Sequence, residues 1–143
     1  MSVIAWDGKT LAADKQMTAQ GLKRTVTKIK KINGCLVGCT GDYDGGLAMM
    51  NWFENGGAFP ECQKDKERWS NLLVIKPDGG INLYEREPFC YVIEDKFYAM
   101  GSGRDYAMAA MYLGKGAVEA VGIAMVFDSN CGMGLDELEV GSE

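Results

Sequence analysis

Three short turn signals, each containing glycine, place the strongest constraint on how this chain folds. Asp7-Gly8, Asn33-Gly34 and residues 77–80 (Pro-Asp-Gly-Gly) each stand between two apolar or alternating runs. Because tight hairpin turns require the positive φ angles that glycine adopts freely, these signals predict three β-hairpins. Glycine accounts for 19 of the 143 residues, and much of it lies at such turns. The chain is therefore expected to build antiparallel sheets.

The remaining pattern adds helices between the hairpins. Strands are expected over residues 2–6, 10–13, 25–32, 35–40, 71–76, 81–85, 89–93, 97–100, 124–127 and 135–140. Helices are expected over residues 44–55, 104–113 and 117–124, with Asp42 as the N-cap of the first. Residues 57–70 resemble an irregular polar connection. Antiparallel strands with grouped helices predict one α+β domain of packed layers over residues 1–143.

Composition narrows the class of protein. The net charge of −5 argues against binding to the phosphate backbone of nucleic acids. No basic and apolar leader follows Met1, and no apolar run approaches the roughly 20 residues that a membrane-spanning helix requires. The five cysteines include no CxxC pair, so they are expected to be reduced thiols. We expect a cytoplasmic protein with no cofactor, metal ion, nucleic-acid partner or membrane partner.

The chain contains no histidine, which limits the chemistry of any active site. Catalytic triads and dyads with an imidazole base are excluded, and so are zinc sites with histidine ligands. Among the remaining proton carriers, only the α-amine titrates near neutral pH without perturbation, with a pKa of about 7.7–8.0. Removal of Met1 before the small Ser2 would place that amine and a hydroxyl nucleophile on one residue. Many proteins begin with Met-Ser, so this feature needs support from the rest of the chain.

Six short motifs provide that support. They occupy residues 2–5, 11–14, 26–32, 36–42, 99–103 and 127–132. In this order and spacing they resemble the proteasome β-subunit and HslV peptidase family, over roughly residues 2–55 and 71–140. Members of that family are N-terminal nucleophile (Ntn) hydrolases. The resemblance implies a four-layer αββα sandwich, in which two antiparallel sheets are flanked by helices. Residues 57–70 are much shorter than the segment of typical members that carries a second helix, so one helical layer is expected to be reduced.

The resemblance also implies a function. It predicts a serine-type N-terminal nucleophile peptidase that hydrolyses peptide bonds through an acyl-enzyme on Ser2 once Met1 is removed. The implied partners are peptide or unfolded protein substrates, further copies of the chain in a homo-oligomeric ring, and an AAA+ ATPase unfoldase.

Three residues match the centre of the family's catalytic site. Ser2 matches the nucleophile, which is usually threonine. Lys28 matches the lysine whose ammonium lies beside that nucleophile, where its charge would lower the proton affinity of the hydroxyl. Asp14 matches the acidic residue that holds this lysine in place. Other interpretations remain open, because Lys28 stands close to Lys30 and Lys31 and could belong to a solvated basic strand face, and Asp14 could be an ordinary turn residue.

Further residues match the surroundings of that site. Gly38 matches the glycine whose backbone N–H serves the oxyanion hole, and Ser102 and Asp128 match residues that organise the α-amine from the far side. Cys131 stands where many members carry serine, which leaves its supporting role in doubt. Gly38 could instead serve close packing, Ser102 could be a helix cap, and Asp128 could be a turn residue.

Two other functions remain open. The chain could be a catalytically inactive ring subunit that keeps the fold and has a structural or regulatory role. Retention of Met1 would favour that interpretation, since it displaces the α-amine and blocks the nucleophile. A non-proteolytic amidohydrolase is the third alternative, because a fold does not determine the substrate.

Overall fold

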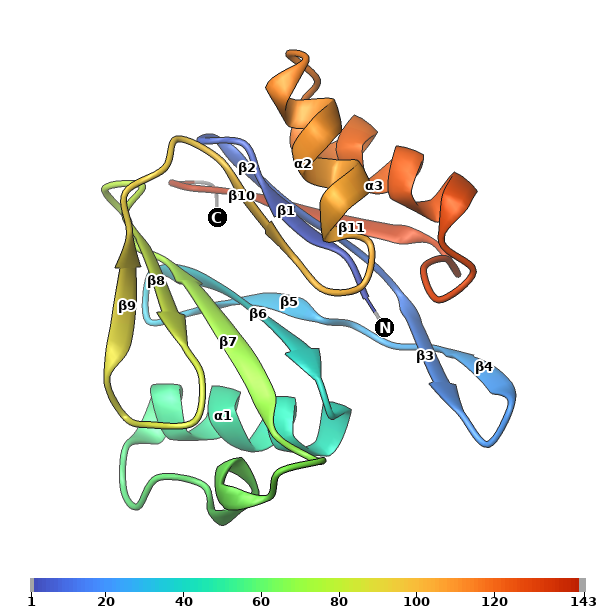
Figure 1. Ribbon diagram of the computed structural model, residues 1–143. Coiled ribbons are helices and arrows are strands. Elements are labelled where there is room, and N and C mark those ends of the chain that lie inside the picture. Colours follow the sequence, from blue (N-terminus) through green and yellow to red (C-terminus); the bar gives the residue numbers. More distant parts are fainter. Residues whose placement is uncertain (1, 142–143) are drawn as a thin grey trace.

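Two antiparallel sheets lie face to face in the computed structural model, which describes residues 2–141 (Figure 1). The four-stranded sheet has the order β10-β1-β2-β11, the five-stranded sheet has the order β5-β6-β7-β8-β9, and β3 pairs only with β4. The strands are β1 Ile4–Trp6, β2 Thr10–Asp14, β3 Gln16–Ala19, β4 Leu22–Thr25, β5 Ile29–Ile32, β6 Cys35–Gly41, β7 Ser70–Ile75, β8 Ile81–Tyr84, β9 Cys90–Ile93, β10 Tyr98–Met100 and β11 Leu135–Glu139. The helices are α1 Tyr43–Asn55, α2 Arg104–Tyr112 and α3 Ala117–Phe127, with a short 3₁₀ helix, η1 Glu61–Lys64.

The predicted turns close the hairpins in two different ways. At Asn33-Gly34 both residues have positive φ, 52° and 80°, as a two-residue type I′ turn requires. At the first turn only Gly8 does, with φ of 100°. There the Asp7 carboxylate accepts backbone N–H groups of the turn, and its Oδ2 also accepts the N–H of Ala117 at 2.8 Å. One side chain thus joins the β1–β2 turn to the start of α3.

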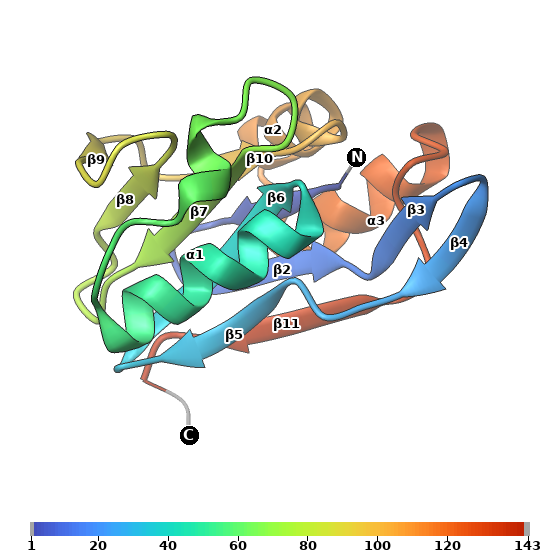
Figure 2. The same ribbon diagram turned by 90° about the horizontal axis from the view of Figure 1, so that it is seen from below.

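Alternation along the strands divides the interior into three apolar layers. In β7, Leu72 and Val74 face α1, whereas Leu73 and Ile75 face the other sheet. The period of two is the expected result of a pleated strand buried on both faces. The third layer lies between the four-stranded sheet and the pair α2 and α3, and it is built largely of alanine, including Ala107, Ala120 and Ala124. The order of layers is therefore helix, sheet, sheet, helix pair, as Figure 1 shows. Figure 2, seen from the α1 side, shows α1 in front of the strands.

The layer that covers the five-stranded sheet is reduced, as the length of residues 57–70 predicts. It consists of α1, which Asp42 caps through a 3.0 Å hydrogen bond from Gly45 N–H, and of the single turn η1. The buried Gln63 holds η1 in place, because its side chain donates to the carbonyl of Ser70 and accepts the N–H of the same residue. These hydrogen bonds satisfy both polar groups of the buried amide.

Two predicted strands are wrong, and one hairpin was not predicted. Residues 25–32 are split, since β4 ends at Thr25 and β5 begins at Ile29 in a different sheet. Residues 124–127 form the last turn of α3, because an apolar run of four fits a helix end as well as a strand. The β3–β4 hairpin turns at Gln20 and Gly21, both with positive φ. No helix within the described residues is long and apolar enough to cross a membrane.

Candidate active site

Ser2 lies just before β1, and both its backbone carbonyl and its side chain accept hydrogen bonds. The carbonyl accepts the N–H of Gly103 at 3.0 Å and the hydroxyl of Ser102 at 3.5 Å. Its Oγ accepts a hydrogen bond from Lys28 Nζ at 2.9 Å. Close approach is possible because Gly101 has φ of +97° and no side chain against the Ser2 carbonyl. The residue is 5% exposed.

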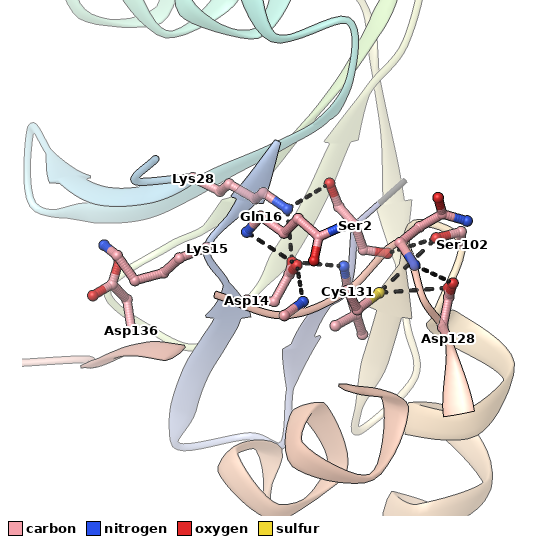
Figure 3. Close-up of polar contacts among 12 residues, drawn as sticks. Ser2, Asp14, Lys15, Gln16, Lys28, Ser102, Asp128, Cys131 and Asp136 are labelled. Carbon is pink, nitrogen blue, oxygen red and sulfur yellow. Dashed lines mark hydrogen bonds and ion pairs between the residues drawn. The ribbon is translucent and has the colours of Figure 1, made fainter. Parts of the chain in front are cut away.

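Lys28 and Asp14 form a buried ion pair beside this hydroxyl (Figure 3). Nζ lies 2.7 Å from Asp14 Oδ1, and the two side chains are 3% and 0% exposed. The carboxylate also accepts backbone N–H groups of Val3 at 3.1 Å, Gln16 at 3.3 Å and Gly132 at 3.0 Å. Burial of two charges is costly unless their remaining hydrogen-bonding capacity is met. Four donors to one carboxylate meet that need and hold the Asp14 side chain in place.

The break between β4 and β5 brings Lys28 to this position. Residues 26–28 leave the hairpin, and the carbonyl of Lys28 accepts the N–H of Cys39 as the chain joins the five-stranded sheet. Lys30 and Lys31, which follow in β5, are exposed. The basic run therefore divides into a buried cation beside Ser2 and a solvated strand face.

Ser102, Asp128 and Cys131 gather on the other side of Ser2 (Figure 3). Cys131 Sγ lies 3.5 Å from Asp128 Oδ2 and 4.0 Å from Ser102 Oγ. Burial, together with the negative charges of Asp14 and Asp128, raises the pKa of the Cys131 thiol to about 12. Burial also acts to raise the pKa of Asp128, but hydrogen bonds from the Asn130 backbone and from the side chains of Ser102 and Cys131 outweigh it and lower that pKa. The cluster thus contains an ionised carboxylate and a protonated thiol.

Gly38 is the one predicted site residue that the structure does not bring to Ser2. It lies in the middle of β6, where a Cβ atom would come within 2.9 Å of side-chain carbons of Ile4 and Ile29. Packing between the two sheets therefore accounts for this glycine. Gly41, at the end of β6, lines the cavity beside Ser2 instead. The oxyanion role of Gly38 stays a prediction.

A cavity of about 280 Å³ opens beside Ser2. Its walls are formed by Ser2, Gln16, Met17, Thr18, Ala19, Lys28, Cys39, Gly41, Asp42, Tyr43 and Asp44. Strand β3 supplies one wall, and the start of α1 supplies another. Sequence reasoning missed the β3 wall, although the Gln20-Gly21 pair is a usable turn signal. Among the described residues, no group of three or more histidine, cysteine, aspartate or glutamate side chains is arranged to hold a metal ion.

Comparison with known proteins gives matches of structure alone. No protein-family model and no curated protein sequence matches the chain. BPH from Thiobacillus denitrificans in complex with epoxomicin matches with a TM-score of 0.74 and 22% identity over 99% of this chain and 100% of that chain. Another structure of BPH from the same organism gives 0.72 and 21% identity over 99% of both chains. Eukaryotic HslV from Trypanosoma brucei gives 0.71 and 21% identity over 96% of this chain and 97% of that one.

The structural matches cover nearly the whole chain. They therefore include both sheets and the helices on either side of them. They confirm the fold that the sequence motifs predict, including the antiparallel sheets and the helices on both outer faces. The protein therefore has a proteasome/HslV-like Ntn-hydrolase fold, with the helical layer over its five-stranded sheet reduced to α1 and η1.

Proposed function

We propose that the protein hydrolyses peptide bonds, with Ser2 as an N-terminal nucleophile. The observation that carries the proposal is the position of the Lys28 ammonium, 2.9 Å from Ser2 Oγ and 2.7 Å from Asp14. A hydroxyl held against a buried cation is activated as a nucleophile, since the cation stabilises the negative charge that develops on the oxygen during attack. Asp14 and Lys28 keep their predicted roles in this proposal.

Lys28 is not the base in this mechanism. Its Nζ already donates to the Asp14 carboxylate at 2.7 Å and to Ser2 Oγ at 2.9 Å, so Lys28 acts in this mechanism as a fixed donor beside the nucleophile. The α-amine of Ser2, once freed, has a pKa near neutrality and takes the Oγ proton directly or through a water. Oγ attacks the scissile carbonyl, the proton passes to the leaving amine, and a water then hydrolyses the acyl-enzyme. Ser102 and Asp128 are proposed to orient the amine from the opposite side.

Removal of Met1 is a requirement of the proposal, and Met1 lies outside the described residues. Intact-mass measurement of the purified protein tests it directly, with an expected loss of one methionine. Epoxomicin, which T. denitrificans BPH binds in its structure, then serves as the probe. We expect one adduct on the processed chain, and neither adduct nor peptide turnover in Ser2→Ala. Turnover that persists in Ser2→Ala would reject the mechanism.

The alternative is a catalytically inactive ring subunit, and Cys131 is the feature that favours it. A thiol S–H is a weaker hydrogen-bond donor to Asp128 than the serine hydroxyl of the resembled family. Full-length mass with no adduct would support this alternative. The homo-oligomeric ring, the AAA+ unfoldase and the cytoplasmic location stay predictions of the sequence resemblance.

A further inference from the structure

The β3–β4 hairpin extends from one end of the molecule without a third strand (Figures 1 and 2). All four residues of β4 are exposed, and Leu22 keeps 54% of its surface. Two-stranded hairpins are marginally stable in water unless another surface packs against them. The hairpin also carries charge of one sign, since residues 16–25 contain two cations and no acidic residue. Lys23 and Arg24 lie in the exposed strand.

Strand β9 lies at the opposite end of the molecule from the hairpin (Figures 1 and 2). There β9 is the edge strand of the five-stranded sheet, and Phe89, Val92 and Tyr91 are 78%, 66% and 59% exposed. Clustered exposed apolar side chains mark interaction surfaces, and an open edge strand needs cover. A second cavity, of about 370 Å³, lies between Trp69 and Phe89.

Acidic residues surround this apolar end. Residues 85–96 contain four carboxylates, at Glu85, Glu87, Glu94 and Asp95, against two cations. One of these cations, Arg86, donates hydrogen bonds to backbone carbonyls of the same chain, at Gln63 and Lys64. The β9 end therefore offers negative charge around an apolar centre, whereas the hairpin offers positive charge around Leu22.

We propose that the β3–β4 hairpin of one copy docks on the β9 end of a second copy, with Leu22 in the cavity beside Phe89 and with Lys23 and Arg24 against the surrounding carboxylates. The two surfaces differ and lie at opposite ends, so the contact is heterologous and repeats head to tail. Such a repeat builds a ring or a filament. In the ring predicted from the sequence resemblance, this contact would join each copy to the next.

Docking also affects the cavity beside Ser2, because β3 forms one of its walls. A neighbour that covers β4 restrains β3 and with it the Met17 and Thr18 side of the cavity. This consequence rests on the proposed function, whereas the contact itself does not. Catalysis is then expected to depend on assembly, since a loosely held wall would position substrate poorly.

Charge reversal tests the contact. In Lys23→Glu/Arg24→Glu the hairpin becomes acidic and meets the acidic β9 end, and opposition of like charges costs several kcal/mol. We expect the dissociation constant for assembly to rise by about 100-fold or more, measured by sedimentation velocity over a dilution series. Glu87→Lys/Glu94→Lys should disrupt assembly to a similar extent. A mixture of the two variants should recover the higher-order species, because each supplies the surface that complements the other.

The matched control is Arg104→Glu/Lys115→Glu, which makes the same change in charge at two exposed positions, one at the start of α2 and one between α2 and α3. It should assemble as the wild type does. Hydrogen exchange provides a second readout, in which amides of residues 16–25 are protected in the assembled wild type and exchange rapidly in Lys23→Glu/Arg24→Glu. Unchanged assembly of that variant, a monomeric wild type, or no recovery on mixing would overturn the proposal. None of these readouts uses turnover, so the result is independent of the Ser2 test.

Discussion

Two lysine–aspartate pairs of nearly equal length include the neighbouring residues Asp14 and Lys15, and the two pairs have different roles. Lys28–Asp14 measures 2.7 Å and Lys15–Asp136 measures 2.6 Å. The side chains of the first pair are 3% and 0% exposed, whereas those of the second are 21% and 34% exposed. Asp14 and Lys15 are consecutive residues, so their side chains point to opposite sides as a strand requires.

The difference teaches that burial, and not the distance between the charges, determines what an ion pair contributes. In the exposed pair, water and salt screen the attraction, and the net stabilisation is small. In the buried pair, removal of one partner leaves a charge in the interior without compensation. Only the buried pair contacts a nucleophile, through the hydrogen bond from Lys28 to Ser2 Oγ.

The largest expected effect is therefore that of Lys28→Met. This change leaves the Asp14 carboxylate buried without its cation, and we expect the free energy of unfolding to fall by about 3–5 kcal/mol. Peptidase activity should fall by about 100-fold or more, since the stabilising charge beside Ser2 Oγ is lost. Urea unfolding followed by tryptophan fluorescence measures the first effect, and initial rates measure the second. A stability loss under about 1 kcal/mol would show that the pair is solvated.

Lys15→Ala is the corresponding change in the exposed pair, and its expected effect is smaller. We expect a loss of about 0–1 kcal/mol in unfolding free energy, which decreases further in high salt. Double-mutant cycles sharpen the comparison, with Lys28→Met and Asp14→Asn in one cycle and Lys15→Ala and Asp136→Ala in the other. The buried cycle should give the larger coupling energy. Equal coupling energies in the two cycles would contradict the role assigned to burial.

Asp128 provides the smallest expected effect, because the causes that lower its pKa are hydrogen bonds. Its pKa is lowered in the folded protein despite the opposing effect of burial. A lowered folded-state pKa adds stability above the unfolded value, roughly pH 3.9, and that stability is lost as the pH falls through the folded value. The difference in unfolding free energy between the wild type and Asp128→Asn should thus be constant near neutral pH and should shrink in acid. Urea midpoints measured from pH 6 downward test this, and a difference that grows in acid would contradict it.

Local sequence predicted those parts of the fold that local chemistry specifies. Asn33-Gly34 formed its hairpin because both residues tolerate positive φ, and Asp42 capped α1 because its side chain reaches the N–H of Gly45. The errors fall where short-range patterns are ambiguous. Residues 25–32 alternate as one strand would, yet the chain leaves one sheet and enters another at residues 26–28.

The candidate site could be predicted only for those residues that belong to the family motifs. Ser2, Asp14 and Lys28 meet as the resemblance implies, and Ser102 and Asp128 gather near Ser2. Gly38 lies in the middle of β6 and its oxyanion role stays a prediction, because a sequence with several nearby glycines does not reveal which one reaches the cavity that Gly41 lines. The β3 wall was missed for a similar reason, since its strand alternation is weak.

The sequence by itself determined which chemistry is available, because a chain without histidine leaves few groups that transfer protons near neutral pH. It also determined the turns, because positive φ depends on the residue at that position. The residues alone left open that Lys28 belongs to a solvated basic strand face and that Asp14 is an ordinary turn residue, and the tertiary structure decided that both are buried. The physical reason is that desolvation of a charge depends on all the segments packed around it, and those segments are distant in the sequence.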